Sequence, residues 1–361
     1  MLITHIVGAR PNFMKAAPVL AAFQKRGWPQ MLIHTGQHYD QLMSELQFEQ
    51  LELPKPDLNL GAGSGTHAQQ TATVMIGVES ALVERRPDLL VVYGDVNSTM
   101  AATITAAKLQ IPVAHVEAGL RSFDRTMPEE INRLVTDRLS TYLFTPSADG
   151  DENLHNEGAD PTSIIRVGNV MIDTLIRCLP VADPAKVLAP LGINAGTPYI
   201  LVTLHRPSTV DSPELLEPVL DVLAKLAATH PVVFPIHPRT RARLAAKWSS
   251  TPGLHIVDPV GYLEFLGLEK HARLVITDSG GVQEETTYLR VPCLTVRDNT
   301  ERPVTVTAGT NALVGRDATR LMTAAMERLE TQAVSGTIPE LWDGRAAERI
   351  ADALEPDVRG W

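Results

Sequence analysis

Two carboxylates in the first half of the chain stand where a side chain could transfer a proton. Asp95 follows the apolar run Leu89–Tyr93, and Glu117 follows the apolar run Val113–Val116. A carboxylate directly after a buried strand costs free energy unless it is paired or used, and a positioned carboxylate can serve as a general acid or base. Asp95 could equally cap the next helix, so the pattern alone leaves both roles open.

Glu129 is a third candidate carboxylate. It lies with Glu130 directly after Pro128. Proline suits the first turn of a helix, and acidic side chains there interact favourably with the helix dipole. The pattern alone therefore leaves Glu129 open between a catalytic and a structural role.

The segment Ile276–Glu285 has the residues of an anion site. An apolar run ends in the small-residue turn Ser279-Gly280-Gly281, and a helical stretch follows. A helix start presents unpaired N–H groups and the positive end of the helix dipole, and glycines let a phosphate approach the backbone. Glu284 and Glu285 could bind the hydroxyls of a nucleotide ribose. The alternative is an ordinary strand–turn–helix with the serine as its cap.

Cations and a histidine also fall at strand ends. Arg10 and Lys15 flank a helix start, which suits an anion, although solvated surface cations are the alternative. Their turn has one glycine and is not a dinucleotide fingerprint. Arg302 follows a later apolar run, as does His205, which belongs to no zinc spacing, so we expect no metal site. Phe265 could stack on a base, although an isolated aromatic usually joins the core.

Size and composition indicate an ordinary globular protein of two domains, with 361 residues, 44% of them hydrophobic. The formal charge of −10 argues against a nucleic-acid groove. No apolar run approaches the length of a membrane span, and the N-terminus resembles a first strand rather than a signal peptide. Cys178 and Cys293 are expected to be buried free thiols, which favours a cytoplasmic location.

Apolar strands alternate with amphipathic helical stretches along the chain. In the first half we expect strands at Leu2–Val7, Met31–His34, Leu89–Tyr93, Val113–Val116 and Tyr142–Thr145, and helices at Phe13–Arg26, Gln41–Leu51, His67–Arg85, Thr99–Leu109 and Pro128–Ser140. In the second half we expect strands at Tyr199–Thr203, Val232–Ile236, His255–Val257, Leu274–Thr277 and Cys293–Val296, and helices at Ser212–His230, Thr319–Glu330 and Ala346–Leu354. This alternation predicts the α/β class, with parallel sheets covered on both faces.

The Pro-, Ala- and Gly-rich stretch Leu179–Thr197 indicates the region between two such domains. Open parallel sheets bind ligands beyond the carboxyl ends of their strands. We therefore expect the active site in a cleft between the two domains.

These segments resemble the UDP-N-acetylglucosamine 2-epimerase family, most closely its non-hydrolysing members. The motifs that carry the resemblance are Gly8-Ala9-Arg10-Pro11, His115–Arg121, Pro128–Arg133, Asp278–Glu285 and Thr300-Glu301-Arg302-Pro303. The resemblance implies a glycosyltransferase-B-like architecture of two Rossmann-like domains, usually a homodimer, with a C-terminal helix that returns to the first domain. The expected domains are residues 1–170 with 346–361, and residues 171–345, which would bind UDP.

The resemblance also implies roles for individual residues. Asp95, Glu117, Glu129 and His205 match the family's catalytic groups. Ser279, Gly280 and Gly281 would hold the diphosphate, Glu285 the ribose and Phe265 the uracil, while Arg10, Lys15, His205 and Arg302 would stabilise the departing phosphates.

The implied reaction interconverts UDP-N-acetylglucosamine and UDP-N-acetylmannosamine by anti elimination of UDP and its re-addition. It needs no cofactor. Epimerases that oxidise the sugar with NAD typically carry a Tyr-x-x-x-Lys pair, and none of the six tyrosines has a lysine at that spacing. The alternatives are a hydrolysing 2-epimerase, a 2-epimerase of a related UDP-diacetamido uronic acid, a glycosyltransferase of the same fold, and a sugar-nucleotide-binding protein without catalysis.

Overall fold

The computed structural model describes residues 2–37, 48–244, 248, 250–331 and 336–358, and all structural statements concern these residues. The chain divides into two compact units. The first unit comprises Met1–Arg177 and Glu340–Trp361, and the second comprises Cys178–Pro339. The first division falls after the expected domain end at 170, because most of the helix Val170–Cys178 belongs to the first unit. The second falls at Glu340, before the expected end at 345.

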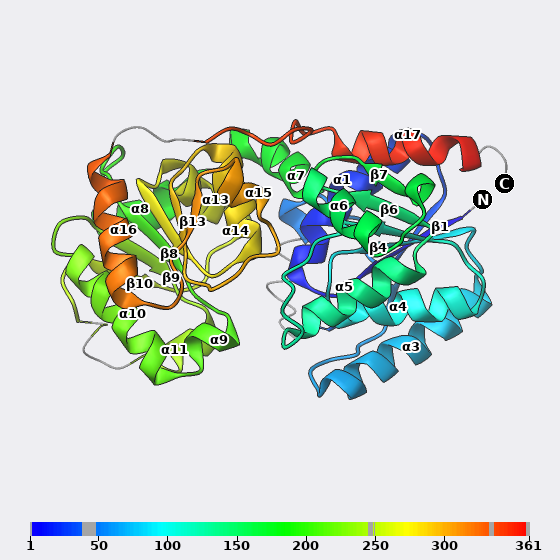
Figure 1. Cartoon of the computed structure of the whole chain (residues 1–361), viewed down its shortest axis with the longest axis horizontal. Helices are drawn as coiled ribbons and strands as arrows, with labels where there is room; N and C mark the ends of the chain where they lie inside the picture. Colours follow the sequence, from blue (N-terminus) through cyan, green and yellow to red (C-terminus); the bar gives the residue numbers. More distant parts are fainter. Residues whose placement is uncertain (1, 38–47, 245–247, 249, 332–335, 359–361) are drawn as a thin grey trace. The chain divides into compact units, whose positions relative to one another are not determined.

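The first unit is built on a seven-stranded sheet with the order β3-β2-β1-β4-β5-β6-β7, in which all pairs are parallel. Its strands are β1 (Ile3–Val7), β2 (Gln30–His34), β3 (Leu58–Asn59), β4 (Leu89–Tyr93), β5 (Val113–Val116), β6 (Tyr142–Thr145) and β7 (Ile164–Arg166). Every residue of β4 is fully buried, because helices cover both faces of the sheet (Figure 1). Burying one such Val or Leu side chain contributes about 1.5–3 kcal/mol.

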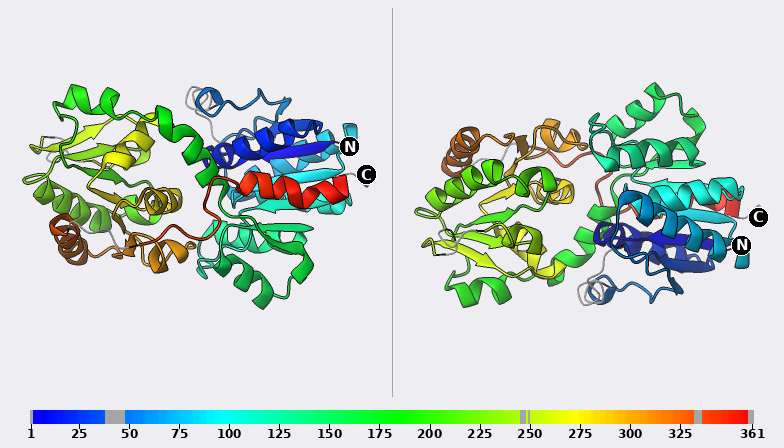
Figure 2. Two further views of the ribbon diagram at one scale, coloured as in Figure 1. Left: turned by 90° about the horizontal axis from the view of Figure 1, so that it is seen from above. Right: turned by 90° about the horizontal axis from the view of Figure 1, so that it is seen from below.

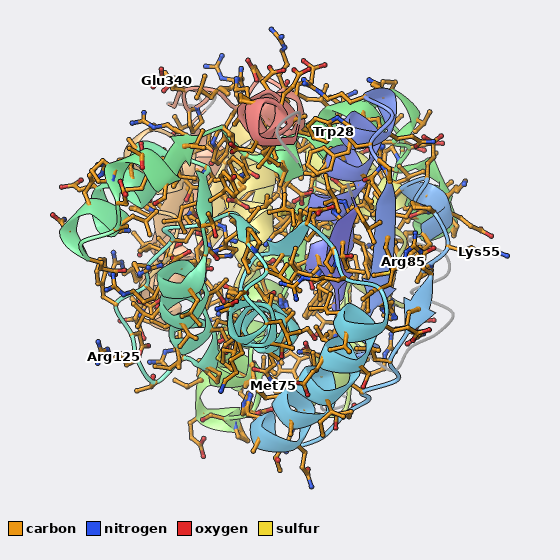
Figure 3. All side chains as sticks on the ribbon, turned by 90° about the vertical axis from the view of Figure 1, so that its right-hand side faces the viewer. Trp28, Lys55, Met75, Arg85, Arg125 and Glu340 are labelled. Carbon is orange, nitrogen blue, oxygen red and sulfur yellow. The ribbon has the colours of Figure 1, made fainter. Side chains whose placement is uncertain are left out.

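Helices connect these strands. They are α1 (Arg10–Lys25), α3 (His67–Glu84), α4 (Asn97–Lys108), α5 (Pro128–Leu139), α6 (Ala148–Asn156), α7 (Val170–Cys178) and the C-terminal α17 (Ala346–Val358), with the 3-10 turn η1 (Pro161–Ser163). The C-terminal helix α17 lies along α1 (Figure 2). There Arg26 pairs with Asp352 and Glu355, and its guanidinium lies 5.5 Å from the ring centroid of Trp28, which Figure 3 labels.

The second unit has a six-stranded sheet with the order β10-β9-β8-β11-β12-β13, again with all pairs parallel. Its strands are β8 (Ile200–Thr203), β9 (Val232–Pro235), β10 (Leu254–Val257), β11 (Leu274–Thr277), β12 (Cys293–Thr295) and β13 (Asn311–Leu313). Its helices are α8 (Ala185–Leu188), α9 (Pro207–Val210), α10 (Pro213–Leu226), α11 (Pro238–Arg241), α13 (Tyr262–His271), α14 (Gly280–Leu289), α15 (Val304–Thr307) and α16 (Ala318–Glu330), with the 3-10 turns η2 (Leu179–Val181) and η3 (Ala189–Leu191).

The observed architecture confirms the expected α/β class with two parallel sheets. Three strands were missed: β3, β7 and β13 have only two or three residues, too few for an apolar pattern to stand out. Residues 41–47 of the expected helix Gln41–Leu51 lie outside the described part of the chain, and residues 48–50 are helical. No described helix is long and apolar enough to cross a membrane.

In each sheet the strand order reverses beside the first strand of the unit, between β1 and β4 and between β8 and β11. Ligands of such sheets bind at this reversal, beyond the carboxyl ends of the strands. The turns that follow β1, β4 and β5 in the first unit, and β8, β11 and β12 in the second, therefore hold the candidate site residues.

Candidate active site

A buried ion pair in the first unit joins helix α1 to the turn after β5. Lys15 on α1 contacts Oε2 of Glu117, which follows β5, and the two side chains are 3% and 4% exposed. Gly94 makes room for the pair, since a Cβ there would lie 2.5 Å from Nζ of Lys15 and 3.1 Å from Oε2 of Glu117. The sheet edge thus brings a buried cation and a buried carboxylate together.

The backbone of Glu117 is held in an unfavourable conformation. Its φ of 75° lies in the left-handed region, which costs a residue other than glycine about 1–3 kcal/mol. The N–H groups of Glu117 and Ala118 both donate to the carbonyl of Phe144, at 3.1 and 3.0 Å, and so fix this turn. Backbone strain of this kind is typical of residues whose side chain is held in one orientation at a functional site.

Asp95, after β4, contacts Nη1 of Arg133 on α5. Asn132 donates from its amide to the carbonyl of Asp95 at 2.8 Å. Arg133 is itself oriented by Glu130, 2.6 Å from its Nη2. Asn132 and Arg133 were not predicted from the sequence as site residues. The i,i+3 spacing of Glu130 and Arg133 could have indicated the contact between these two, since it places them on one helix face.

The two acidic residues at the start of α5 differ in their surroundings. Glu130 is buried and accepts hydrogen bonds from the backbone N–H groups of Ser122 and Phe123 at 3.0 and 2.9 Å. Burial raises the pKa of Glu130, but these bonds and Arg133 outweigh it and hold the pKa below its usual value. Glu130 is therefore structural, whereas its neighbour Glu129 is half-buried.

A second row of buried polar side chains begins on β5, the strand that Glu117 follows. His115 on β5 is fully buried, with Nδ1 2.6 Å from Asp137 and Nε2 2.8 Å from the carbonyl of Gly94. Arg121 lies 2.7 Å from the other oxygen of Asp137. Burial alone would raise the pKa of Asp137, but His115 and Arg121 lower it below its usual value. This row supports the turns that carry Asp95 and Glu117.

In the second unit, Asp278 after β11 organises the turn after β8. Its buried carboxylate accepts from the backbone N–H groups of His205 and Arg206 at 2.8–3.1 Å, and Nδ1 of His205 lies 3.1 Å from Oδ1. Burial would raise the pKa of Asp278, but these partners lower it overall. The His205 side chain remains 40% exposed. Asp278 therefore orients the ring, and the rest of the ring is accessible to a ligand.

Three arginines gather around the buried carboxylate of Glu301. Arg302 contacts Oε1, Arg297 lies 2.7 Å from Oε2, and Arg206 lies 3.5 Å from Oε1. Burial opposes the charge on Glu301, yet the three cations hold its pKa well below the usual value. Three guanidiniums against the carboxylates of Glu301 and Glu284 leave an excess of positive charge.

The glycine turn at the start of α14 lies against this cluster. A Cβ on Gly280 would clash with Nη1 of Arg302 and lie 2.7 Å from Oε1 of Glu301. Gly280 therefore lets the arginine approach the helix start, a role that the sequence analysis assigned only to a phosphate. Ser279 makes no side-chain cap to α14, which removes the alternative of a simple capping serine.

Two residues expected at the nucleoside lie further along. Glu285 on α14 is 3% exposed and accepts from the hydroxyl of Tyr262 at 2.8 Å. Phe265 on α13 is half-buried and packs against an apolar cluster of this unit. Glu284 lies 2.9 Å from Nε of Arg302 and so belongs to the arginine cluster.

The residues predicted to form the site thus fall into two groups, one in each unit. Lys15, Asp95, Glu117 and Glu129 lie at the carboxyl edge of the first sheet or on the helix start beside it, and His205, Ser279, Gly280, Gly281 and Arg302 lie at that of the second. Arg10 begins α1, but its side chain lies outside the described part. Within the described residues, no group of three or more His, Cys, Asp or Glu side chains could hold a metal ion.

Comparison with known proteins identifies the family of this chain. The profile of the UDP-N-acetylglucosamine 2-epimerase family matches residues 21–355. The UDP-N-acetylglucosamine 2-epimerase of Methanocaldococcus jannaschii is 44% identical over 98% of this chain and 99% of its own length. The UDP-2,3-diacetamido-2,3-dideoxy-D-glucuronate 2-epimerase of Pseudomonas aeruginosa is 41% identical over 98% of this chain and 99% of its own.

A crystal structure of the M. jannaschii enzyme, in complex with UDP-GlcNAc and UDP, superposes with a TM-score of 0.91 at 42% identity, over 99% of this chain and 100% of that one. Fold, motifs and sequence agree over nearly the whole length. The chain therefore belongs to the UDP-N-acetylglucosamine 2-epimerase family.

Proposed function

We propose that this protein is a UDP-N-acetylglucosamine 2-epimerase of the non-hydrolysing type, an isomerase that interconverts UDP-N-acetylglucosamine and UDP-N-acetylmannosamine. The observation that carries the proposal is the buried Lys15–Glu117 pair at the carboxyl edge of the first sheet, in a chain of this family. Glu117 is both strained and anchored, which is the expected state of a carboxylate that handles a proton.

The first step breaks the bond between C1 of the sugar and the pyrophosphate oxygen, and the electron pair leaves with UDP. The arginine cluster of Arg206, Arg297 and Arg302, together with His205 and the α14 helix start, supplies fixed positive charge for the departing oxygen. Nη1 of Arg297 is buried without a partner among the described residues, which suits a donor awaiting a phosphate oxygen. Arg10 and Lys15 would add cations from the first unit.

The second step removes the C2 proton onto a carboxylate, which leaves a 2-acetamidoglucal with a C1–C2 double bond. UDP then adds back at C1 while a proton reaches the opposite face of C2. Asp95, Glu117 and Glu129 are the proposed acid and base groups. Asp95 is oriented by Arg133 and Glu117 by Lys15. The bond that breaks is re-formed, so the cycle consumes no redox equivalent.

UDP would be held by the second unit. We propose that Gly280, Gly281 and Ser279 contact the diphosphate, that Glu285 accepts from the ribose hydroxyls and that Phe265 lies against the uracil. The proposed ribose contact is supported by the carboxylate of Glu285, which Tyr262 already orients.

A second candidate substrate is a UDP-diacetamido uronic acid, because the P. aeruginosa relative that carries this activity in its name is nearly as similar as the M. jannaschii enzyme. Incubation with each sugar nucleotide, followed by chromatography of the products, separates the two. We expect UDP-N-acetylmannosamine from UDP-N-acetylglucosamine. Free N-acetylmannosamine would instead indicate the hydrolysing reaction, and a requirement for an acceptor would indicate a glycosyltransferase.

We further propose that the protein acts as a homodimer in the cytoplasm. Ile76 and Val83, seven positions apart on α3, are 68% and 66% exposed, an apolar row that a second copy could cover. Both cysteines are free and buried, which fits a reducing compartment. Light scattering that gives the mass of a single chain would overturn the dimer.

A further inference from the structure

Glu269 on α13 is a fully buried acid that the proposed mechanism does not use. Its residue exposure is 0%, and neither carboxyl oxygen has a hydrogen-bond donor among the described residues. An ionised carboxylate only accepts hydrogen bonds, and a buried one without donors or a cation is strongly unfavourable. Glu269 must therefore carry a proton, and a protonated carboxyl needs an acceptor.

The acceptor is the carboxyl group of Glu285 on the adjacent helix α14, which lies within hydrogen-bond reach of Glu269. The two helices pack side by side in Figure 1. Two ionised carboxylates could not share this buried space, because like charges repel and water is excluded. One proton between them removes the repulsion and turns the contact into a hydrogen bond.

The surroundings keep the proton in place. Among the described residues, Tyr199, Cys178 and Cys293 also interact with the two acids or with Tyr262, and all three are neutral when protonated. Burial, followed by the charge on Glu285, raises the pKa of Glu269 well above its usual value. Burial also raises the pKa of Glu285, against the opposing effect of the Tyr262 hydroxyl.

We propose that Glu269 is a positioning residue, which stays protonated and donates a hydrogen bond to Glu285 so that the Glu285 carboxylate is held as an acceptor for a ribose hydroxyl. The inference rests on the proposed role of Glu285 in UDP binding. Tyr262 donates to the same carboxylate at 2.8 Å, so two fixed donors orient it. A carboxylate has about four acceptor positions, which leaves room for a ribose hydroxyl.

The test is the preference for ribose, measured by calorimetry with UDP and its 2′-deoxy and 3′-deoxy analogues. We expect the wild-type protein to bind UDP about tenfold more tightly than at least one analogue. Glu269→Leu removes the donor and should reduce this preference to about twofold. Glu269→Gln keeps a donor in a neutral side chain and should retain the preference. A Glu269→Leu variant with the wild-type preference would overturn the inference.

Glu285→Ala separates this inference from the proposed function. If that variant keeps the wild-type preference, Glu285 does not bind ribose and both proposals about it fail. If it loses the preference while Glu269→Leu keeps it, only the positioning role of Glu269 fails.

A second measurement covers a Glu269→Leu variant that does not fold. The infrared difference between the wild-type protein and Glu269→Gln at neutral pH should contain the C=O stretch of a buried protonated carboxyl. A difference spectrum without that band would contradict the protonated state and with it the inference.

Discussion

Lys15 and Glu117 are 102 positions apart in the sequence, yet they form an ion pair that is nearly closed to solvent. Removing one member of a buried ion pair is destabilising, because the other charge then loses a buried partner. The pair therefore links the stability of the sheet edge to the chemistry proposed there.

Glu117→Gln should reduce turnover about 100-fold or more, because the amide cannot exchange a proton with C2. UDP affinity should fall much less than turnover, since most of the proposed UDP contacts lie in the second unit and Lys15 keeps its charge. Steady-state kinetics and calorimetry give the two numbers. Glu152→Gln, an exposed carboxylate on α6, is the matched control and should behave as wild type. Wild-type turnover in Glu117→Gln would remove Glu117 from the mechanism.

Arg302→Ala should weaken UDP binding about tenfold or more, since it removes a charge-assisted contact to the diphosphate. The variant should still fold, because Glu301 keeps Arg297 and Arg206 as partners. Arg316→Ala, which removes a half-exposed arginine paired with Asp298, is the control and should bind UDP normally. Equal affinities of the two variants in calorimetry would argue against an anion site at Arg302.

Gly280→Ala tests whether the glycine serves the arginine. Alanine normally stabilises a helix relative to glycine by about 0.5–1 kcal/mol, but here the added Cβ would displace the Arg302 guanidinium. We expect a folded protein with UDP affinity reduced about tenfold or more, as in Arg302→Ala. The double variant Gly280→Ala/Arg302→Ala should then bind UDP no more weakly than Arg302→Ala alone. Additive losses would show that the glycine acts on the ligand independently of the arginine.

Asp173 on α7 should make stability depend on pH. Its buried carboxylate accepts from the backbone N–H groups of Ala346 and Ala347 at the start of α17, and burial raises its pKa to about 6. The folded state thus binds this proton more tightly than the unfolded state, so the stability it contributes is complete below about pH 4 and is lost as pH rises through about 6.

Asp173→Asn removes that titration. Relative to wild type, the variant should gain stability between pH 4 and pH 7, by up to about 3 kcal/mol. Melting temperatures of both proteins across this range measure the difference. Glu152→Gln, which changes an exposed carboxylate on α6, is the control. Parallel melting curves for wild type and Asp173→Asn at every pH would contradict the raised pKa.

Much of the fold could be predicted because parallel strands buried on both faces are continuous apolar runs. The strands Leu89–Tyr93 and Val113–Val116 were predicted with the bounds that the structure gives them. The missed strands β3, β7 and β13 are short and become strands only through pairing at or near the sheet edges. Each pairs with the strand that precedes it in the chain, and two or three residues are too few to show an apolar pattern of their own.

The candidate site could be predicted only as a set of residue types at strand ends. The contacts of Asp95 with Arg133 and of Glu117 with Lys15 depend on how strands and helices are ordered in space. The same holds for the proton between Glu269 and Glu285, which depends on two helices packing together. The position of a residue after an apolar run indicates that it lies at the carboxyl edge of a sheet. The order of the strands in the sheet decides which of these residues contact one another.

Reversible elimination of UDP is the proposed route to inversion at C2. The most direct measurement is NMR of UDP-N-acetylglucosamine incubated with the protein in deuterated water, without added nicotinamide. We predict that deuterium replaces the C2 proton in the sugar nucleotide while UDP-N-acetylmannosamine accumulates, because a proton delivered to C2 must come from a group that exchanges with solvent. Formation of UDP-N-acetylmannosamine that keeps its original C2 hydrogen throughout, in a protein whose turnover requires nicotinamide, would contradict it.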